Sequence, residues 1–152
     1  MTIIKNISIA VIILLPSLGF AQDDSKYGDT PEQQISCQEA LSVYTSYKKQ
    51  KDYAEAYQQW EKACEVCPPT VNENLYANGT IFIKAEIKTA EADGNDVRVA
   101  VLVDSLMWTY DMRMEYFPST KRKPNNRCHV LGSKAISVYK YNKSDPETAY
   151  LL

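Results

Sequence analysis

Four cysteines and one histidine are the residues best suited to chemistry: Cys37, Cys64, Cys67, Cys128 and His129. Cys64 and Cys67 form a C-x-x-C motif, a spacing found in thiol-redox centres and in zinc sites. The motif falls at the end of a predicted helix, where the helix dipole disfavours the thiolate. A zinc site would also need Cys128 and His129 from a distant segment. A thiol-redox or metal-binding accessory protein that uses Cys64 and Cys67 is therefore the alternative function, not the preferred one.

Motifs for other reactions are missing from the sequence. It contains neither G-x-S-x-G nor H-E-x-x-H, and no histidine directly follows Cys67, as covalent haem attachment would require. We therefore predict that the protein is not an enzyme, with no catalytic residues, no metal and no cofactor.

The first residues have the pattern of a secretory signal peptide. Lys5 precedes an apolar stretch over residues 7–15, and small residues stand at Gly19 and Ala21. We expect cleavage near Ala21 and a periplasmic or secreted location. No later segment offers 18 uninterrupted apolar residues, so stable membrane insertion is not expected.

The charge of the chain argues against a nucleic-acid partner. The sequence has 17 Lys and Arg against 19 Asp and Glu, and loss of residues 1–21 removes only Lys5. The remaining net charge is weak and negative, whereas nucleic-acid binding requires positive charge. The short basic stretch at Lys121, Arg122, Lys123 and Arg127 lies among Pro and Asn residues, which favours an exposed loop.

Helical signals begin after a polar segment at residues 22–34, which we interpret as a flexible leader. The domain is assigned to residues 35–152. Three pairs of residues have the spacing of a capping box, which marks the start of a helix. They predict helices that begin near Cys37, near Tyr53 and just after Thr70. The pairs are Ser36 with Glu39, Asp52 with Glu55, and Thr70 with Glu73.

The remaining chain also has helical periodicity. A turn at residues 92–95 separates the third helix from a fourth, which runs to about Tyr116. Valines alternate at residues 97–103 as they would in a strand, but the following residues have a helical period, so we predict one long helix. A fifth helix is expected over residues 128–141, and a sixth begins at Asp145. The predicted fold is all-α, an array of antiparallel helical hairpins.

An internal repeat supports this architecture. The sequence Ala-Leu-Ser-Val-Tyr at residues 40–44 returns as Ala-Ile-Ser-Val-Tyr at residues 135–139. Asp52 followed by Ala56-Tyr57 likewise returns as Asp145 followed by Ala149-Tyr150. A hairpin of this kind cannot bury both faces alone, so the units are expected to stack.

The segment at residues 37–68 resembles the tetratricopeptide repeat (TPR) family. The positions that carry the resemblance are Tyr47, Asp52-Tyr53, Ala56, Trp60, Ala63 and Pro68. In this pattern the alanines let paired helices approach closely, while the aromatic residues fill the space between hairpins. The resemblance is partial over the last 25 residues and poor in between. Either the chain is a fragment of a longer array, or its last hairpin exposes the apolar surface of the fifth helix.

The resemblance implies a protein-protein interaction scaffold or adaptor whose first helices line a concave face. Carried over to this chain, the partner-binding groove would consist of Gln38, Leu41, Thr45, Lys48 and Lys49. Family members that clamp a terminal carboxylate carry Lys and Asn where this chain has Leu41 and Thr45. We therefore expect a partner peptide or protein with a mixed acidic and apolar segment. A purely structural role in a cell-envelope assembly is a third possibility.

The first hairpin also suggests a disulfide. The start of the first helix and the end of the second lie side by side in an antiparallel hairpin, which places Cys37 near Cys67. We predict a disulfide between them, with Cys64 as a competing partner and Cys128 buried or unpaired.

Overall fold

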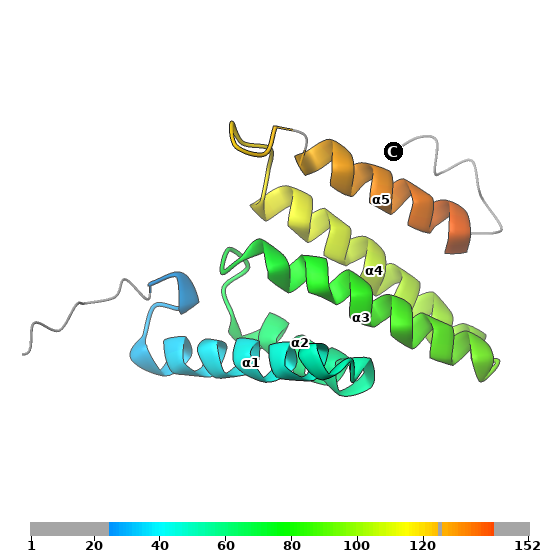
Figure 1. The fold of residues 1–152 in the computed structure, drawn as a ribbon, viewed down its shortest axis with the longest axis horizontal. Coiled ribbons are helices and arrows are strands. Elements are labelled where there is room, and N and C mark those ends of the chain that lie inside the picture. Colours follow the sequence, from blue (N-terminus) through cyan, green and yellow to red (C-terminus); the bar gives the residue numbers. More distant parts are fainter. Residues whose placement is uncertain (1–24, 125, 142–152) are drawn as a thin grey trace, which may run out of the picture.

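The fold is described from a computed structural model, which defines residues 25–124 and 126–141. Within these ranges every regular element is a helix, and the helices follow one another as antiparallel hairpins (Figure 1). The all-α hairpin array predicted from the sequence is therefore confirmed. The elements are the short 3-10 helix η1 (Ser25–Tyr27) and the α-helices α1 (Pro31–Gln50), α2 (Tyr53–Val66), α3 (Glu73–Ala92), α4 (Asp96–Tyr116) and α5 (Asn126–Tyr141).

The helices stack in chain order. Helix α1 packs on α2, α2 on α3, α3 on α4, and α4 on α5. Figure 1 shows α5 at the end of this series, on the side of α4 that faces away from the first hairpin. The predicted sixth helix, from Asp145, lies outside the described residues.

The start of α1 differs from the prediction. The helix begins at Pro31, not near Cys37, and so includes the end of the segment that we expected to be a leader. The Thr30 side chain accepts from the backbone N–H of Gln33, and the Gln33 side chain accepts from the Thr30 N–H, each at 3.3 Å. Proline occupies its favoured first position. This complete capping box precedes the Ser36 pattern, which therefore lies inside the helix.

The other helix starts follow local capping chemistry. Asp52 caps α2 as predicted, with its carboxylate accepting from the Glu55 N–H at 3.3 Å. Helix α3 is capped by Asn72 and not by Thr70, because Val71 turns inward after the two prolines and is 4% exposed. The valine-rich segment at residues 97–103 is helical, as predicted.

The core lies between the first two hairpins. Ala56 and Ala63 of α2 are fully buried, and Trp60 is 3% exposed. The Trp60 Nε1–H donates to the Leu75 carbonyl at 2.7 Å, which ties α2 to the first turn of α3. Tyr47 is half-buried and packs against this core. Trp60 is therefore buried where the first two hairpins meet, as predicted.

Helix α5 is attached to α4 by mixed contacts. Val130 is fully buried, the Tyr110 and Ser137 hydroxyls lie 3.1 Å apart, and Lys134 pairs with Asp111 at 2.6 Å. No helix in the described ranges is long and apolar enough to cross a membrane.

Candidate interaction surfaces

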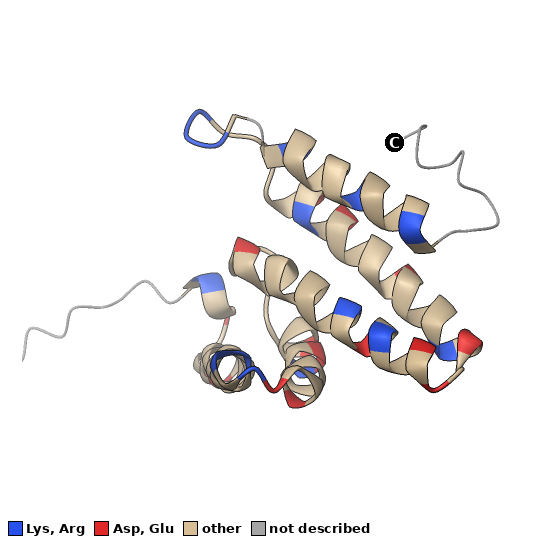
Figure 2. Cartoon of the chain, turned by 45° about the vertical axis from the view of Figure 1, so that its right-hand side comes forward, with Lys and Arg blue, Asp and Glu red and all other residues tan. Residues whose placement is uncertain are grey.

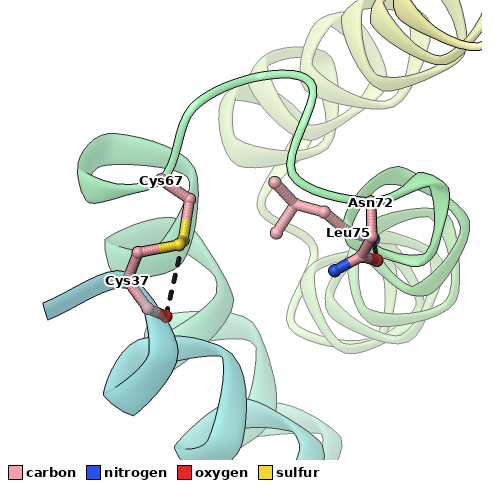
Figure 3. Close-up of a disulfide and its surroundings, with 4 residues drawn as sticks. All are labelled: Cys37, Cys67, Asn72 and Leu75. Atoms are coloured by element: carbon pink, nitrogen blue, oxygen red, sulfur yellow. Dashed lines mark hydrogen bonds between the residues drawn. A yellow bond between two sulfur atoms is a disulfide. The ribbon is translucent and has the colours of Figure 1, made fainter. Parts of the chain in front are cut away.

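The predicted disulfide joins the two helices of the first hairpin. Cys37 near the start of α1 and Cys67 at the end of α2 are bonded, with an S–S distance of 2.06 Å and a Cα–Cα distance of 4.8 Å (Figure 3). The chain leaves Cys67 directly for the loop that leads to Asn72 and α3. The bond therefore fixes the first hairpin at the point where the second hairpin begins.

This disulfide argues against the redox alternative, because it occupies one cysteine of the C-x-x-C motif. Cys67 is bonded to Cys37, so Cys64 has lost the partner that a C-x-x-C centre needs. Cys64 is half-buried, and burial, followed by the nearby charges of Glu61 and Glu65, raises the pKa of its thiol to about 12. Cys128 is exposed on α5. In the part of the chain that the structure describes, no three His, Cys, Asp or Glu side chains group as metal ligands.

The five predicted groove residues share one side of α1, as their three- and four-residue spacing requires. Gln38 and Lys49 are exposed, whereas Leu41, Thr45 and Lys48 are half-buried. The Lys48 Nζ donates to Oδ1 of Asn78 on α3 at 2.5 Å. Lys48 thus has a partner within the chain, and of the two predicted lysines only Lys49 is in the exposed class.

Helix α3 contributes residues to the same face that the sequence analysis did not identify. Ile81 stands three residues after Asn78 and is 41% exposed, and Lys84 and Lys88 follow on the same side of the helix. Figure 2 shows two neighbouring basic positions on α3. The Lys84 Nζ also lies 5.7 Å from the ring centre of Tyr110. We define the first-helix face as Gln38, Thr45 and Lys49 of α1 with Ile81, Lys84 and Lys88 of α3.

A second surface is hollowed between α2 and α4. Two adjoining cavities of about 420 Å³ and 210 Å³ share Tyr57 and Glu61 as lining residues. Val101 and Trp108 of α4 lie along it and are 60% and 43% exposed. We call this surface the α2/α4 groove. Its lining includes Tyr57, Glu61 and Glu65 of α2 and Val101, Ser105 and Trp108 of α4.

The α2/α4 groove is acidic. Glu61 and Glu65 are exposed along α2, while Glu86 at the floor pairs with Arg98 at 2.7 Å. The lining therefore contains three carboxylates, those of Glu61, Glu65 and Glu86, and one guanidinium, that of Arg98. Burial, together with a hydrogen bond to Glu61 and the charge of that carboxylate, raises the pKa of the Tyr57 phenol. The groove thus combines exposed apolar side chains with a surplus of negative charge.

Comparison with known proteins found no match to this chain among family models, curated proteins or solved structures.

Proposed function

We propose that this chain is a non-catalytic scaffold or adaptor of the TPR class that works in the cell envelope after export. It binds a segment of a partner protein along the first-helix face. The observation that carries this proposal is the exposed apolar side chain of Ile81 on α3, which shares one side of that helix with the exposed Lys84 and Lys88.

The partner should contain acidic and apolar residues. Lys49, Lys84 and Lys88 offer ammonium groups to carboxylates, and Ile81 offers an apolar contact beside the two lysines of α3. The disulfide supports this role, because a hairpin fixed at one end loses less conformational freedom when it binds. Preorganised helices also position the lysines before the partner arrives.

Site-specific cross-linking tests the proposal. A photoreactive amino acid at Ile81 should capture partner proteins in envelope extract, and the captured proteins should share an acidic, apolar segment at the point of cross-linking. Purified partner should then lose affinity about tenfold or more for the variant K84E/K88E, because two attractive contacts become repulsive.

The matched control replaces a lysine on another side of the molecule. Lys62 on α2 is exposed and contacts Gln59 within its own helix. The variant K62E should bind the partner as the unmodified protein does. If K84E/K88E and K62E retain equal affinity, the first-helix face is not the binding surface.

The export part of the proposal has its own test. Mass spectrometry of the protein recovered from cells should find a chain that starts just after Ala21 in the envelope fraction. Recovery of the chain with residues 1–21 intact in the cytoplasm would contradict it.

A further inference from the structure

Two carboxylates of α2 lie at the end of the helix that disfavours negative charge. Glu61 and Glu65 are in the last two turns of α2, which ends at Val66 and has no basic residue in its last turn. The C-terminal end of a helix carries partial negative charge and favours cations. The two glutamates are also four residues apart, a spacing at which like charges repel each other. Helix α2 therefore places two negative charges where its own electrostatics disfavour them.

These two carboxylates have no cationic partner in the part of the chain that the structure describes. The ion pairs in residues 25–124 and 126–141 involve other acids, and neither Glu61 nor Glu65 belongs to one. The neutral phenol of Tyr57 is hydrogen-bonded to Glu61. After burial, the charges of both glutamates are what raises the pKa of the neighbouring Cys64 thiol. The wall of the groove is therefore negatively charged.

The smaller of the two cavities brings the same carboxylates together with an aromatic ring. Its volume is about 210 Å³, and its lining includes Glu61, Glu65 and Trp108. Trp108 is 43% exposed, and its ring lies 6.2 Å from the ring of Tyr76 in an edge contact that supports it from within the chain. An exposed indole beside two carboxylates attracts a cation both through ion pairing and through a cation–π contact.

The adjoining cavity shows which cation suits this groove. There Arg98 of the chain itself pairs with Glu86 at 2.7 Å. One of the three carboxylates of the groove thus has a guanidinium partner, and Glu61 and Glu65 are left without one. A planar guanidinium also stacks on an aromatic ring and donates two parallel hydrogen bonds to a carboxylate, whereas the ammonium of lysine is a strongly hydrated point charge. The site therefore fits arginine better than lysine.

The opposite wall of the groove is apolar. Val101 and Trp108 of α4 are 60% and 43% exposed, and both line the groove. A segment that satisfies both walls must be basic on one side and apolar on the other. Two arginines about one helical turn apart in that segment would match the spacing of Glu61 and Glu65.

We propose that the α2/α4 groove binds an amphipathic, arginine-bearing segment of a protein partner. The arginines pair with Glu61 and Glu65, and one of them stacks on Trp108, while apolar residues of the segment contact Val101. This surface is opposite in charge to the first-helix face, so the two surfaces select different segments. A chain with both can hold an acidic and a basic segment together. That consequence rests on the proposed function, whereas binding at the groove does not.

Titration with a synthetic peptide tests the proposal. The probe is the acetylated and amidated peptide ALRLAARLA, whose two arginines are four residues apart. Trp108 is the exposed one of the two tryptophans, so the fluorescence of the chain should change when the peptide binds. The dissociation constant should lie at or below about 1 mM, as for one small contact. The same peptide with citrulline in place of both arginines loses the charge but keeps the shape, and it should bind at least about tenfold more weakly.

Variants of the groove test the assigned residues. E61Q/E65Q removes both charges and should lower the affinity for the arginine peptide to that for the citrulline peptide. Its urea midpoint should equal or exceed that of the unmodified chain, because a repulsion is removed. W108L should weaken binding of the arginine peptide several-fold in calorimetry. E32Q/E39Q, which removes two exposed charges from α1, is the matched control and should bind as the unmodified chain does.

Three results would overturn the proposal. Equal affinity for the arginine and citrulline peptides would leave only an apolar contact. Equal affinity of E61Q/E65Q and the unmodified chain for the arginine peptide would show that these carboxylates do not bind it. Peptide affinity that falls as the protein is concentrated would mean that a second copy of the chain occupies the groove. All three are independent of the first-helix face, since K84E/K88E alters no residue of this groove.

Discussion

Gly79 of α3 lies directly against the indole ring of Trp60 on α2. A Cβ atom added to Gly79 would stand 2.4 Å from Cζ2 of Trp60, a distance that requires the indole ring or one of the two helices to move. Gly79→Ala should therefore destabilise the protein, although alanine favours a helix by about 1 kcal/mol over glycine. Overpacking costs about 1–3 kcal/mol and exceeds that gain. Urea denaturation would measure a net loss of up to about 2 kcal/mol.

A second substitution tests whether the indole is the cause. In a Trp60→Leu background the ring is gone, so Gly79→Ala should cost less or should stabilise through helix propensity. An equal cost in both backgrounds would show that the loss comes from elsewhere in α3. Gly132 on α5 is the control, because a Cβ there meets no atom within 4 Å, and Gly132→Ala should stabilise.

The Cys37–Cys67 disulfide should contribute on the order of 3 kcal/mol to the free energy of unfolding, because it closes a loop with a sequence separation of 30 residues. The variant C37A/C67A should unfold at correspondingly lower urea concentration. Single replacement of Cys64 by Ala leaves the disulfide intact and serves as the control. If the double variant and the C64A variant were equally stable, the disulfide would contribute nothing to the free energy of unfolding.

The two remaining thiols should react with alkylating reagents at very different rates. Cys128 is exposed, whereas Cys64 is half-buried with a pKa near 12. At pH 8 roughly 10⁻⁴ of the Cys64 thiol is ionised, and the thiolate is the reactive species. Mass spectrometry of the native protein treated with iodoacetamide should find one rapid modification, on Cys128. Rapid modification of Cys64 would indicate that the α2/α4 groove opens in solution.

Much of the fold could be predicted because local signals and tertiary packing agree. Asp52 is a cap with a glutamate three residues later, and Trp60 lies on the apolar side of α2, so propensity and burial favour the same structure. The start of α1 was misplaced because two capping patterns follow each other. The first of them, at Thr30, lies in a polar segment with no apolar periodicity to indicate a helix.

The candidate interaction surfaces could be predicted only in part. Helix periodicity predicts which residues share the side of α1 that carries Lys49. Which residues of α3 lie beside them depends on how the hairpins pack. The contact between Lys48 and Asn78, 30 residues apart, is a tertiary feature that neither sequence segment indicates alone. The α2/α4 groove joins two helices that are not consecutive, so no local pattern could have revealed it.

Glu73, the first residue of α3, should make the free energy of unfolding depend on pH. Burial disfavours its charge, but hydrogen bonds from Lys123, Arg113 and Asn126 outweigh that effect and lower its pKa to about 2. A depressed pKa in the folded state adds stability above the unfolded value of about 4.3, and this is lost as pH falls towards 2. Glu73→Gln should therefore cost about 1 kcal/mol at pH 7 and progressively less below about pH 4. Urea titrations of both proteins at several pH values measure the difference, and a cost that stayed constant down to pH 2 would contradict the assignment.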